Sequence, residues 1–137
     1  MPNPKPKPSR KRAAKVQEPS EAEVMKTCMA LLAFWRFFHW RNNSGSLRDA
    51  TGRPVRFGKV GSADILAVVP RSGRLLAVET KKRGGKLTDH QREFLMKVEA
   101  SGGVAVVICE PVKLEEILQT LAVDPWCEVR SEWKAAS

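Results

Sequence analysis

The sequence predicts an α/β fold in which the elements follow the order αβββαβα. Three observations predict it. Apolar residues recur at helical spacing after Ser20, two β-rich runs follow each other across a short turn at residues 71–73, and a helical segment then leads into the apolar run "VAVVIC". The chain has 137 residues, 42% of them hydrophobic, so it can bury one core of its own. We therefore expect one globular domain.

The first half of the chain predicts one helix and one short strand. Ser20 followed by Glu21 and Glu23 suits a helix N-terminus, and the helix should run from about Glu21 to Phe37. Apolar residues recur along it at helical spacing: Val24, Cys28, Leu31, Trp35 and Phe38. Residues 41–45 look like a short strand or turn. Residues 46–61 show no sustained periodicity and predict a long, basic loop or an irregular hairpin.

The second half carries clearer signals. The runs "DILAVVP" and "RLLAVETK" are joined by Arg71-Ser72-Gly73 and predict a β-hairpin. A helix should follow from Thr88 to Ala100, closed by the glycine pair at 102–103. "VAVVIC" then predicts a buried strand, and a final amphipathic helix is expected over residues 113–121.

Charge favours a polyanionic partner. The chain has 24 Lys and Arg against 15 Asp and Glu, a formal net charge of +9, which favours nucleic acid over a neutral small molecule. Residues 1–19 contain six basic side chains, one glutamate and several prolines with little to bury, and predict a disordered basic arm. The globular domain is then residues 20–122, and residues 123–137 form a tail.

Three cysteines, Cys28, Cys109 and Cys127, lie far apart, with only two histidines in the chain, so neither a zinc site nor a disulfide scaffold is expected. No apolar run approaches the ~20 residues of a membrane span, and the N-terminus lacks the apolar core of a signal peptide. We expect a soluble, cytoplasmic protein without membrane contact. In a nucleated cell the basic arm would also resemble an import signal.

The end of the second hairpin strand gathers charged residues. Side chains alternate along a strand, so Glu79 and Lys81 point to the same side. If the hairpin closes around residues 72–73, Asp64 falls opposite Lys81, and if it slips by one pair, Asp64 falls opposite Glu79. Both registers place all three side chains on one face of the sheet.

Two carboxylates held close together repel each other, and a hard divalent cation such as Mg²⁺ removes the repulsion. The backbone carbonyl of Thr80 and water would complete its ligand shell. Such a cation polarises a phosphodiester and activates water, while a neighbouring lysine stabilises the negative charge that develops at phosphorus. The alternative is a plain cross-strand salt bridge between Lys81 and Asp64 on a solvated sheet face.

The stretch "GSADILAVVPRSGRLLAVETKKRGGKLTDHQREFLMKVEASGGVAVVI" resembles the core of the VRR-NUC family, a branch of the PD-(D/E)xK nucleases. The shared features are a Gly-x-x-Asp entry, a glycine in the hairpin, a Glu-x-Lys strand end, a "GKLT" helix start followed by glutamine, and a "GG" before the last strand. The resemblance covers about residues 20–121. It implies a restriction-endonuclease-like fold with a central mixed sheet flanked by helices. Ala63 departs from the proline or serine of many members.

The resemblance also implies roles for individual residues. Asp64 and Glu79 would be metal ligands for Mg²⁺ or Mn²⁺, Lys81 the catalytic lysine, and Gln91 the glutamine near the site. A further acidic ligand would be Glu21 or, less well matched, Glu23. Two of these residues have ordinary structural roles as alternatives: Gln91 fits the N3 position of a capping box, and Glu21 complements the dipole of the first helix.

Basic residues flank the acidic cluster and predict a DNA path: Arg48, Arg53, Arg56, Lys59, Lys82, Arg83 and Lys86. The expected function is that of a Mg²⁺- or Mn²⁺-dependent DNA endonuclease. The resemblance extends to one-domain relatives of Holliday-junction-resolvase type from phages and bacteria. It therefore implies branched DNA, recombination or repair, and a homodimer in a bacterial or phage-infected cell.

Two other functions stay open. The chain would be a non-catalytic DNA-binding or packaging protein if the acidic cluster is only structural, or the nuclease subunit of a larger restriction or repair complex.

In the tail, Asp124-Pro125 suits the start of a short helix with Trp126, Val129 and Trp133 on one side. Either the core of this domain or a second subunit must cover these tryptophans, and we expect the second subunit.

Overall fold

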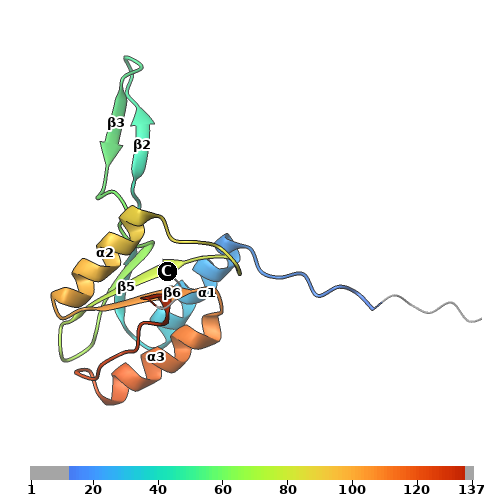
Figure 1. Cartoon of the computed structure of the whole chain (residues 1–137), viewed down its shortest axis with the longest axis vertical. Helices are drawn as coiled ribbons and strands as arrows, with labels where there is room; N and C mark the ends of the chain where they lie inside the picture. Colours follow the sequence, from blue (N-terminus) through green and yellow to red (C-terminus); the bar gives the residue numbers. More distant parts are fainter. Residues whose placement is uncertain (1–12, 135–137) are drawn as a thin grey trace, which may run out of the picture.

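A four-stranded mixed sheet forms the centre of the structure, and a separate two-stranded ribbon stands out from it (Figure 1). The computed structural model describes residues 13–134. The strands are β1 (Phe38–Arg41), β2 (Gly45–Arg48), β3 (Pro54–Phe57), β4 (Ile65–Val68), β5 (Leu75–Thr80) and β6 (Val104–Ile108). The helices are α1 (Glu21–Phe34), α2 (Asp89–Ala100), α3 (Pro111–Val123) and the 3₁₀ turn η1 (Glu132–Lys134).

The sheet has the order β1-β4-β5-β6. β1 pairs antiparallel with β4, and β4 pairs antiparallel with β5 across the predicted hairpin. β5 and β6 are parallel, and α2 supplies the crossover that a parallel pair requires. The sequence thus predicted the hairpin and the last strand, while the pairing of β1 at the far edge comes from the fold.

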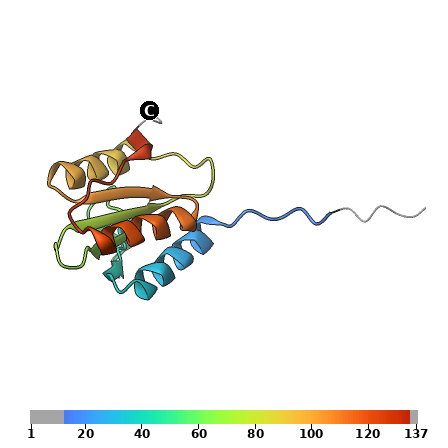
Figure 2. The same cartoon turned by 90° about the horizontal axis from the view of Figure 1, so that it is seen from below.

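Helices cover both faces of the sheet. Figure 2 shows α1 and α3 on one side and α2 on the other. The alternation of β5 separates the two layers: Leu76 and Val78 pack with residues of α1 and α3, whereas Ala77 packs with Leu95 of α2. Both layers are closed to solvent, because all of these residues are fully buried. This α/β architecture confirms the predicted fold class.

Several boundaries differ from the prediction. α1 ends at Phe34 instead of Phe37, because Arg36 adopts a positive φ of 59° and Phe37 then turns into the core. The short strand expected at residues 41–45 lies at Phe38–Arg41. The last helix is longer than expected and begins at Pro111, where a missing N–H costs nothing. The segment predicted as a loop or an irregular hairpin contains the regular pair β2 and β3.

The tail is built differently from the prediction. The helix expected to start at Asp124 is absent from residues 13–134: α3 is followed by an isolated turn, in which the Cys127 N–H donates to the Asp124 carbonyl (3.2 Å), and then by η1. Trp133 is 8% exposed, packs under α2, and donates from Nε1 to the carbonyl of Ala105 (2.9 Å). The expectation that a second subunit covers Trp133 is therefore wrong, because the domain itself covers it. Trp126 is 68% exposed.

The predicted basic arm falls mostly outside the described residues. Residues 13–20 are extended and exposed and lead away from the sheet (Figure 1). Residues 1–12, where most of the predicted basic side chains lie, are outside the described range. Within residues 13–134, no helix is both long enough and apolar enough to cross a membrane.

Candidate nuclease active site

The predicted acidic residues meet at one end of the β4–β5 pair. Ile65 pairs with Val78, so continuing the ladder by one pair sets Asp64 opposite Glu79. This is the second of the two registers that the sequence allowed. Leu66, two residues after Asp64, and Ala77, two residues before Glu79, lie on the same face and pack against the α2 layer. Asp64 and Glu79 therefore both face the side of the sheet that α2 covers.

Asp64 is held by the strand beside it. The backbone N–H and the hydroxyl of Thr80 both donate to Asp64 Oδ2, each over 2.8 Å. The Asp64 carbonyl in turn accepts from the backbone N–H of Asn42 (2.8 Å). These bonds fix the backbone and one carboxylate oxygen, so the residue is positioned before any ligand arrives.

Glu79 is almost completely buried, with 1% of its surface exposed. Its Oε1 accepts from Gln91 Nε2 (2.7 Å) and lies 3.4 Å from Lys81 Nζ. Its Oε2 is buried and has no hydrogen-bond partner among residues 13–134. Burial, with help from the charge of Asp64, raises the pKa of Glu79 to about 7, although Lys81 opposes the shift.

Gln91 combines the two roles that the sequence left open. Its Oε1 accepts from the backbone N–H of Thr88 (3.0 Å), and its own N–H donates to Thr88 Oγ1 (3.2 Å), which completes a capping box. Its Nε2 donates to Glu79. An amide has an acceptor and a donor end, so one side chain both starts α2 and orients Glu79.

The two candidate acidic residues of α1, Glu21 and Glu23, make different contacts. Glu23 is used in a capping box with Ser20, whose N–H donates to Glu23 Oε2 (2.7 Å). Glu21 takes no part in that cap, and its charge adds a small upward contribution to the pKa of Glu79. Glu21 is thus the better placed of the two. Even so, no group of three or more His, Cys, Asp or Glu side chains within residues 13–134 is close enough to hold a metal.

The donor set nevertheless fits a hard divalent cation. Asp64 and Glu79 offer carboxylate oxygens on one face, and a buried carboxylate oxygen without a donor is costly unless a proton or a cation compensates it. Burial raises the pKa of the Cys28 thiol to about 12, so this thiol stays protonated in the core.

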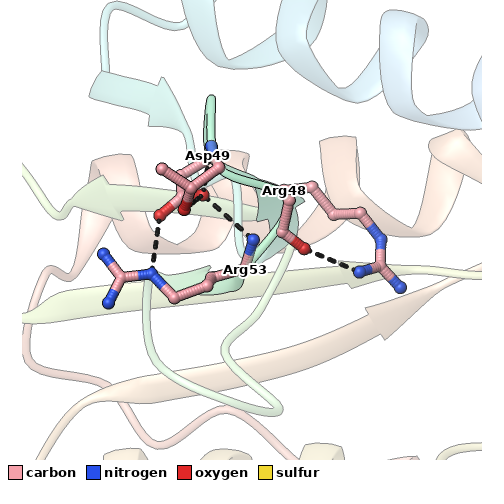
Figure 3. Close-up of polar contacts among 5 residues, drawn as sticks. Arg48, Asp49 and Arg53 are labelled. Carbon is pink, nitrogen blue, oxygen red and sulfur yellow. Dashed lines mark hydrogen bonds and ion pairs between the residues drawn. The ribbon is translucent and has the colours of Figure 1, made fainter.

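The predicted DNA-contacting residues form two groups. Arg48, Arg53, Arg56 and Lys59 lie on the β2–β3 ribbon and its return stem, and Lys82, Arg83 and Lys86 lie in the loop after β5. The side chains of three of the seven have partners among residues 13–134. Figure 3 shows Arg53 paired with Asp49 (3.3 Å) and Arg48 donating to the Gly52 carbonyl (2.8 Å) at the ribbon tip. Arg83 pairs with Glu110 (2.6 Å) and Glu18 (3.4 Å).

Asn42 and the apolar side of the ribbon were not predicted from the sequence. The amide of Asn42 donates to Ser62 Oγ and to the carbonyl of Ala63 (2.9 Å), directly before Asp64. A lone asparagine after a short strand gave no signal of this. The ribbon did give a signal, because apolar and polar residues alternate in "GSLR" and "PVRF" on either side of an Asp-x-x-Gly turn.

Comparison with known proteins identifies the family of the chain. A family model, the VRR-NUC domain, matches residues 18–112, a range that includes Asp64, Glu79, Lys81 and Gln91. A search of curated proteins and a search of solved structures each gave no match. The domain implies a nuclease that acts on DNA. The chain therefore belongs to the VRR-NUC family of PD-(D/E)xK nuclease domains.

Proposed function

We propose that this protein is a Mg²⁺- or Mn²⁺-dependent DNA endonuclease that acts on branched DNA, and that Asp64 and Glu79 hold the cation. The observation that carries the proposal is the buried, unpartnered Oε2 of Glu79 on the same sheet face as a second carboxylate. A protein gains nothing in stability from such a pair, so a ligand is the simplest reason for it.

Neighbouring residues fix the positions of Asp64 and Glu79, the two carboxylate ligands in the proposal. Thr80 holds Asp64 through two hydrogen bonds, and its backbone carbonyl is the proposed third ligand. Gln91 holds Glu79 through Oε1, which leaves Oε2 for the cation. Glu21, whose charge acts on Glu79, is the proposed acidic contribution from α1. Groups that orient metal ligands matter for affinity nearly as much as the ligands do.

The reaction is hydrolysis of a phosphodiester. A water oxygen bonds to phosphorus while one P–O ester bond breaks, so that a phosphomonoester and a free hydroxyl result. A bound divalent cation supplies Lewis-acid polarisation of the scissile phosphate. The Lys81 ammonium, partly buried and 3.4 Å from Glu79 Oε1, is placed to stabilise the negative charge that grows on the phosphoryl oxygens.

Branched DNA and a homodimer are the finer parts of the proposal. The net charge of +9 and the exposed basic side chains of Arg56, Lys59, Lys82 and Lys86 suit a phosphate backbone. Branch selectivity rests on the resemblance to Holliday-junction resolvases. Two symmetric nicks in a four-way junction require two active sites related by a two-fold axis, which a homodimer provides.

The test is a cleavage assay on four-way junction, flap, single-stranded and linear duplex DNA with Mg²⁺, Mn²⁺ or EDTA. We expect cleavage only with a cation, most rapidly at the junction, and none by Asp64→Asn. Glu116→Gln, which changes an exposed carboxylate on α3, is the matched control and should cut normally. Tight binding without cleavage of any DNA would favour the packaging protein, and equal cutting of all four DNAs would contradict branch selectivity alone.

A further inference from the structure

The β2–β3 ribbon is exposed on both sides. Among the residues that the structure describes, its strands pair only with each other (Figure 1), and every residue of both strands is exposed to solvent. A two-stranded ribbon is marginally stable alone in water, so an ordered one requires support at its base or its tip. The β2–β3 ribbon is supported at its base and at its tip.

The base of the ribbon is joined to the active site. Asn42, on the outgoing stem, donates from its backbone to the Asp64 carbonyl (2.8 Å) and from its amide to the Ala63 carbonyl (2.9 Å). On the return stem, Gly61 has a φ of 75°, and a Cβ there would lie 2.4 Å from the backbone of His90. His90 belongs to the first turn of α2, which also carries Gln91. The ribbon therefore projects from the residues that form the site.

The tip is fixed by one carboxylate. Asp49 Oδ1 accepts from the backbone N–H of Thr51 (2.8 Å) and of Arg53 (2.9 Å), and Oδ2 pairs with the Arg53 side chain (3.3 Å) (Figure 3). The hydrogen bonds of Thr51 lower the pKa of Asp49. Asp49 is the one acidic residue between positions 42 and 62, against four basic ones. Its carboxylate is used within the turn, by the hydrogen bonds from Thr51 and Arg53.

The two faces of the ribbon differ. Leu47 pairs with Val55 and Gly45 with Phe57, so these side chains share an apolar face, on which Leu47 is 67% exposed. The Phe57 ring covers Gly45, where a Cβ would lie 3.3 Å from Cζ. The opposite face carries the pairs Ser46–Arg56 and Arg48–Pro54. We call the first set, Leu47, Val55 and Phe57, the apolar face, and the second the basic face.

We propose that the ribbon distinguishes branched from linear DNA: the basic face binds phosphates and the apolar face contacts bases that are unstacked at a branch point. This inference rests on the proposed function and names the element that would set its substrate. The net positive charge of the ribbon complements the DNA backbone, and a two-stranded ribbon is narrow enough to enter a major groove. Apolar side chains act as wedges between base steps, and a branch point lowers the cost of unstacking.

An intact duplex offers the ribbon phosphates but keeps its bases stacked, so the apolar face gains little there. The contributions of the two faces to DNA binding can therefore be measured separately, by substitutions at adjacent residues of β3 and at their cross-strand partners. Leu47→Thr/Val55→Thr removes apolar surface from one cross-strand pair and keeps side chains suited to a strand. Arg56→Gln, one position along β3, removes charge from the other face.

The experiment measures equilibrium binding in EDTA, so no cleavage occurs, to a four-way junction and to a linear duplex with the same arm sequences. The Leu47→Thr/Val55→Thr variant should lose about 5- to 10-fold in affinity for the junction and little for the duplex, with its salt dependence unchanged. Arg56→Gln should weaken binding to both DNAs, and its log–log salt slope should flatten by about 0.9, the value for one phosphate that is no longer neutralised. A 2-aminopurine base at the branch point should brighten on binding of the wild type and less with the double variant.

Three results would overturn the inference: equal losses on both DNAs with the double variant, no loss on either, or a dimer in wild-type sedimentation that the double variant converts to monomer. The last would mean that a second copy covers the apolar face. Unchanged circular dichroism and melting temperature are the folding control, because neither side chain contacts the core. Since no cation is present, the outcome does not depend on whether Asp64 and Glu79 hold a metal.

Discussion

The end of β5 and the β2–β3 ribbon are two strand regions held in place by opposite means. At the end of β5, packing on both sheet faces and hydrogen bonds from Thr80 and Gln91 position Asp64 and Glu79. The ribbon has no core contact, and its shape depends on its turn and its stems. Substitutions at the buried site should therefore alter both chemistry and stability, whereas substitutions on the exposed ribbon should alter binding alone.

The largest expected effect is at the buried site. Glu79→Gln should keep the fold and abolish cation-dependent cleavage, because an amide is a near-isostere but a poorer ligand for a hard cation. Cleavage of junction DNA with Mg²⁺ over a range of concentrations measures this. Full activity in the variant would remove Glu79 from the site.

Within the tail, substitution of a buried tryptophan should lower the stability of the fold much more than substitution of an exposed one. Trp133→Ala should lower the free energy of unfolding by about 3 kcal/mol, because it opens a cavity under α2 and removes the bond to the Ala105 carbonyl. Trp126→Ala, at an exposed position, should change it by about 0.5 kcal/mol or less. Urea unfolding of both variants provides the comparison, and similar losses would contradict it.

Lys81→Ala should lower the single-turnover cleavage rate by roughly 10², the scale of removing one electrostatic interaction with the transition state, while DNA binding stays within a few fold. Lys82→Ala, which changes the next and exposed lysine, is the control and should act mainly on affinity. If Lys81→Ala weakened binding and cleavage to the same extent, Lys81 would be a phosphate-binding residue only.

The burial of Glu79 also predicts a pH dependence of stability. Its pKa of about 7 in the folded chain exceeds the ordinary value of 4.5, so the folded state holds a proton that the unfolded chain releases at lower pH. In EDTA, stability should therefore fall as the pH rises from about 4.5 through 7, by about 1–3 kcal/mol, and Glu79→Gln should lose this fall.

Adding Mg²⁺ at pH 8 should restore stability to the wild type but not to Glu79→Gln, because a cation that binds only the folded chain stabilises it. Urea midpoints at pH 5 and pH 8, with and without Mg²⁺, measure both effects. Identical pH profiles for the two proteins would show that the Glu79 carboxyl is solvated in the folded chain.

The smallest effect on the fold is expected from the N-terminal arm. Deleting residues 1–19 removes six basic side chains and one glutamate, a net charge of +5, and the ion pair of Glu18 with Arg83 is an exposed one. The melting temperature should change little. Affinity for DNA should fall, and the log–log salt slope should flatten by about 0.9 for each phosphate that the arm neutralises in the full-length protein. A large drop in melting temperature would mean that the arm packs on the domain.

The sequence was sufficient to place Asp64 and Glu79 on one face, because the buried run after Asp64 and the buried run before Glu79 fix the alternation of the two strands. It could not choose between the two hairpin registers, since a slip by one pair keeps both side chains on that face. The choice depends on the turn, where Arg71 and Gly73 both adopt positive φ values. Arg71 gives no sign of this in the sequence.

The ribbon and the tail were harder to predict for a different reason. Four alternating residues on each side of a turn predict a hairpin weakly when no core selects one face. In the tail, the two tryptophans indicated that another surface covers them, but the sequence does not say which surface. Trp133 is covered by Ala105 and the α2 layer, and these contacts join residues that are far apart in the chain.

The double use of Gln91 has a consequence for local motion. One amide closes the first turn of α2 at Thr88 and holds Glu79 on its other side, so fraying of that turn and release of the carboxylate are a single event. The exchange of the Thr88 amide proton with solvent thus reports on the Glu79 carboxylate from outside the site. A spectroscopist can follow how firmly Glu79 is held through a backbone resonance at the start of α2, without touching the residue itself.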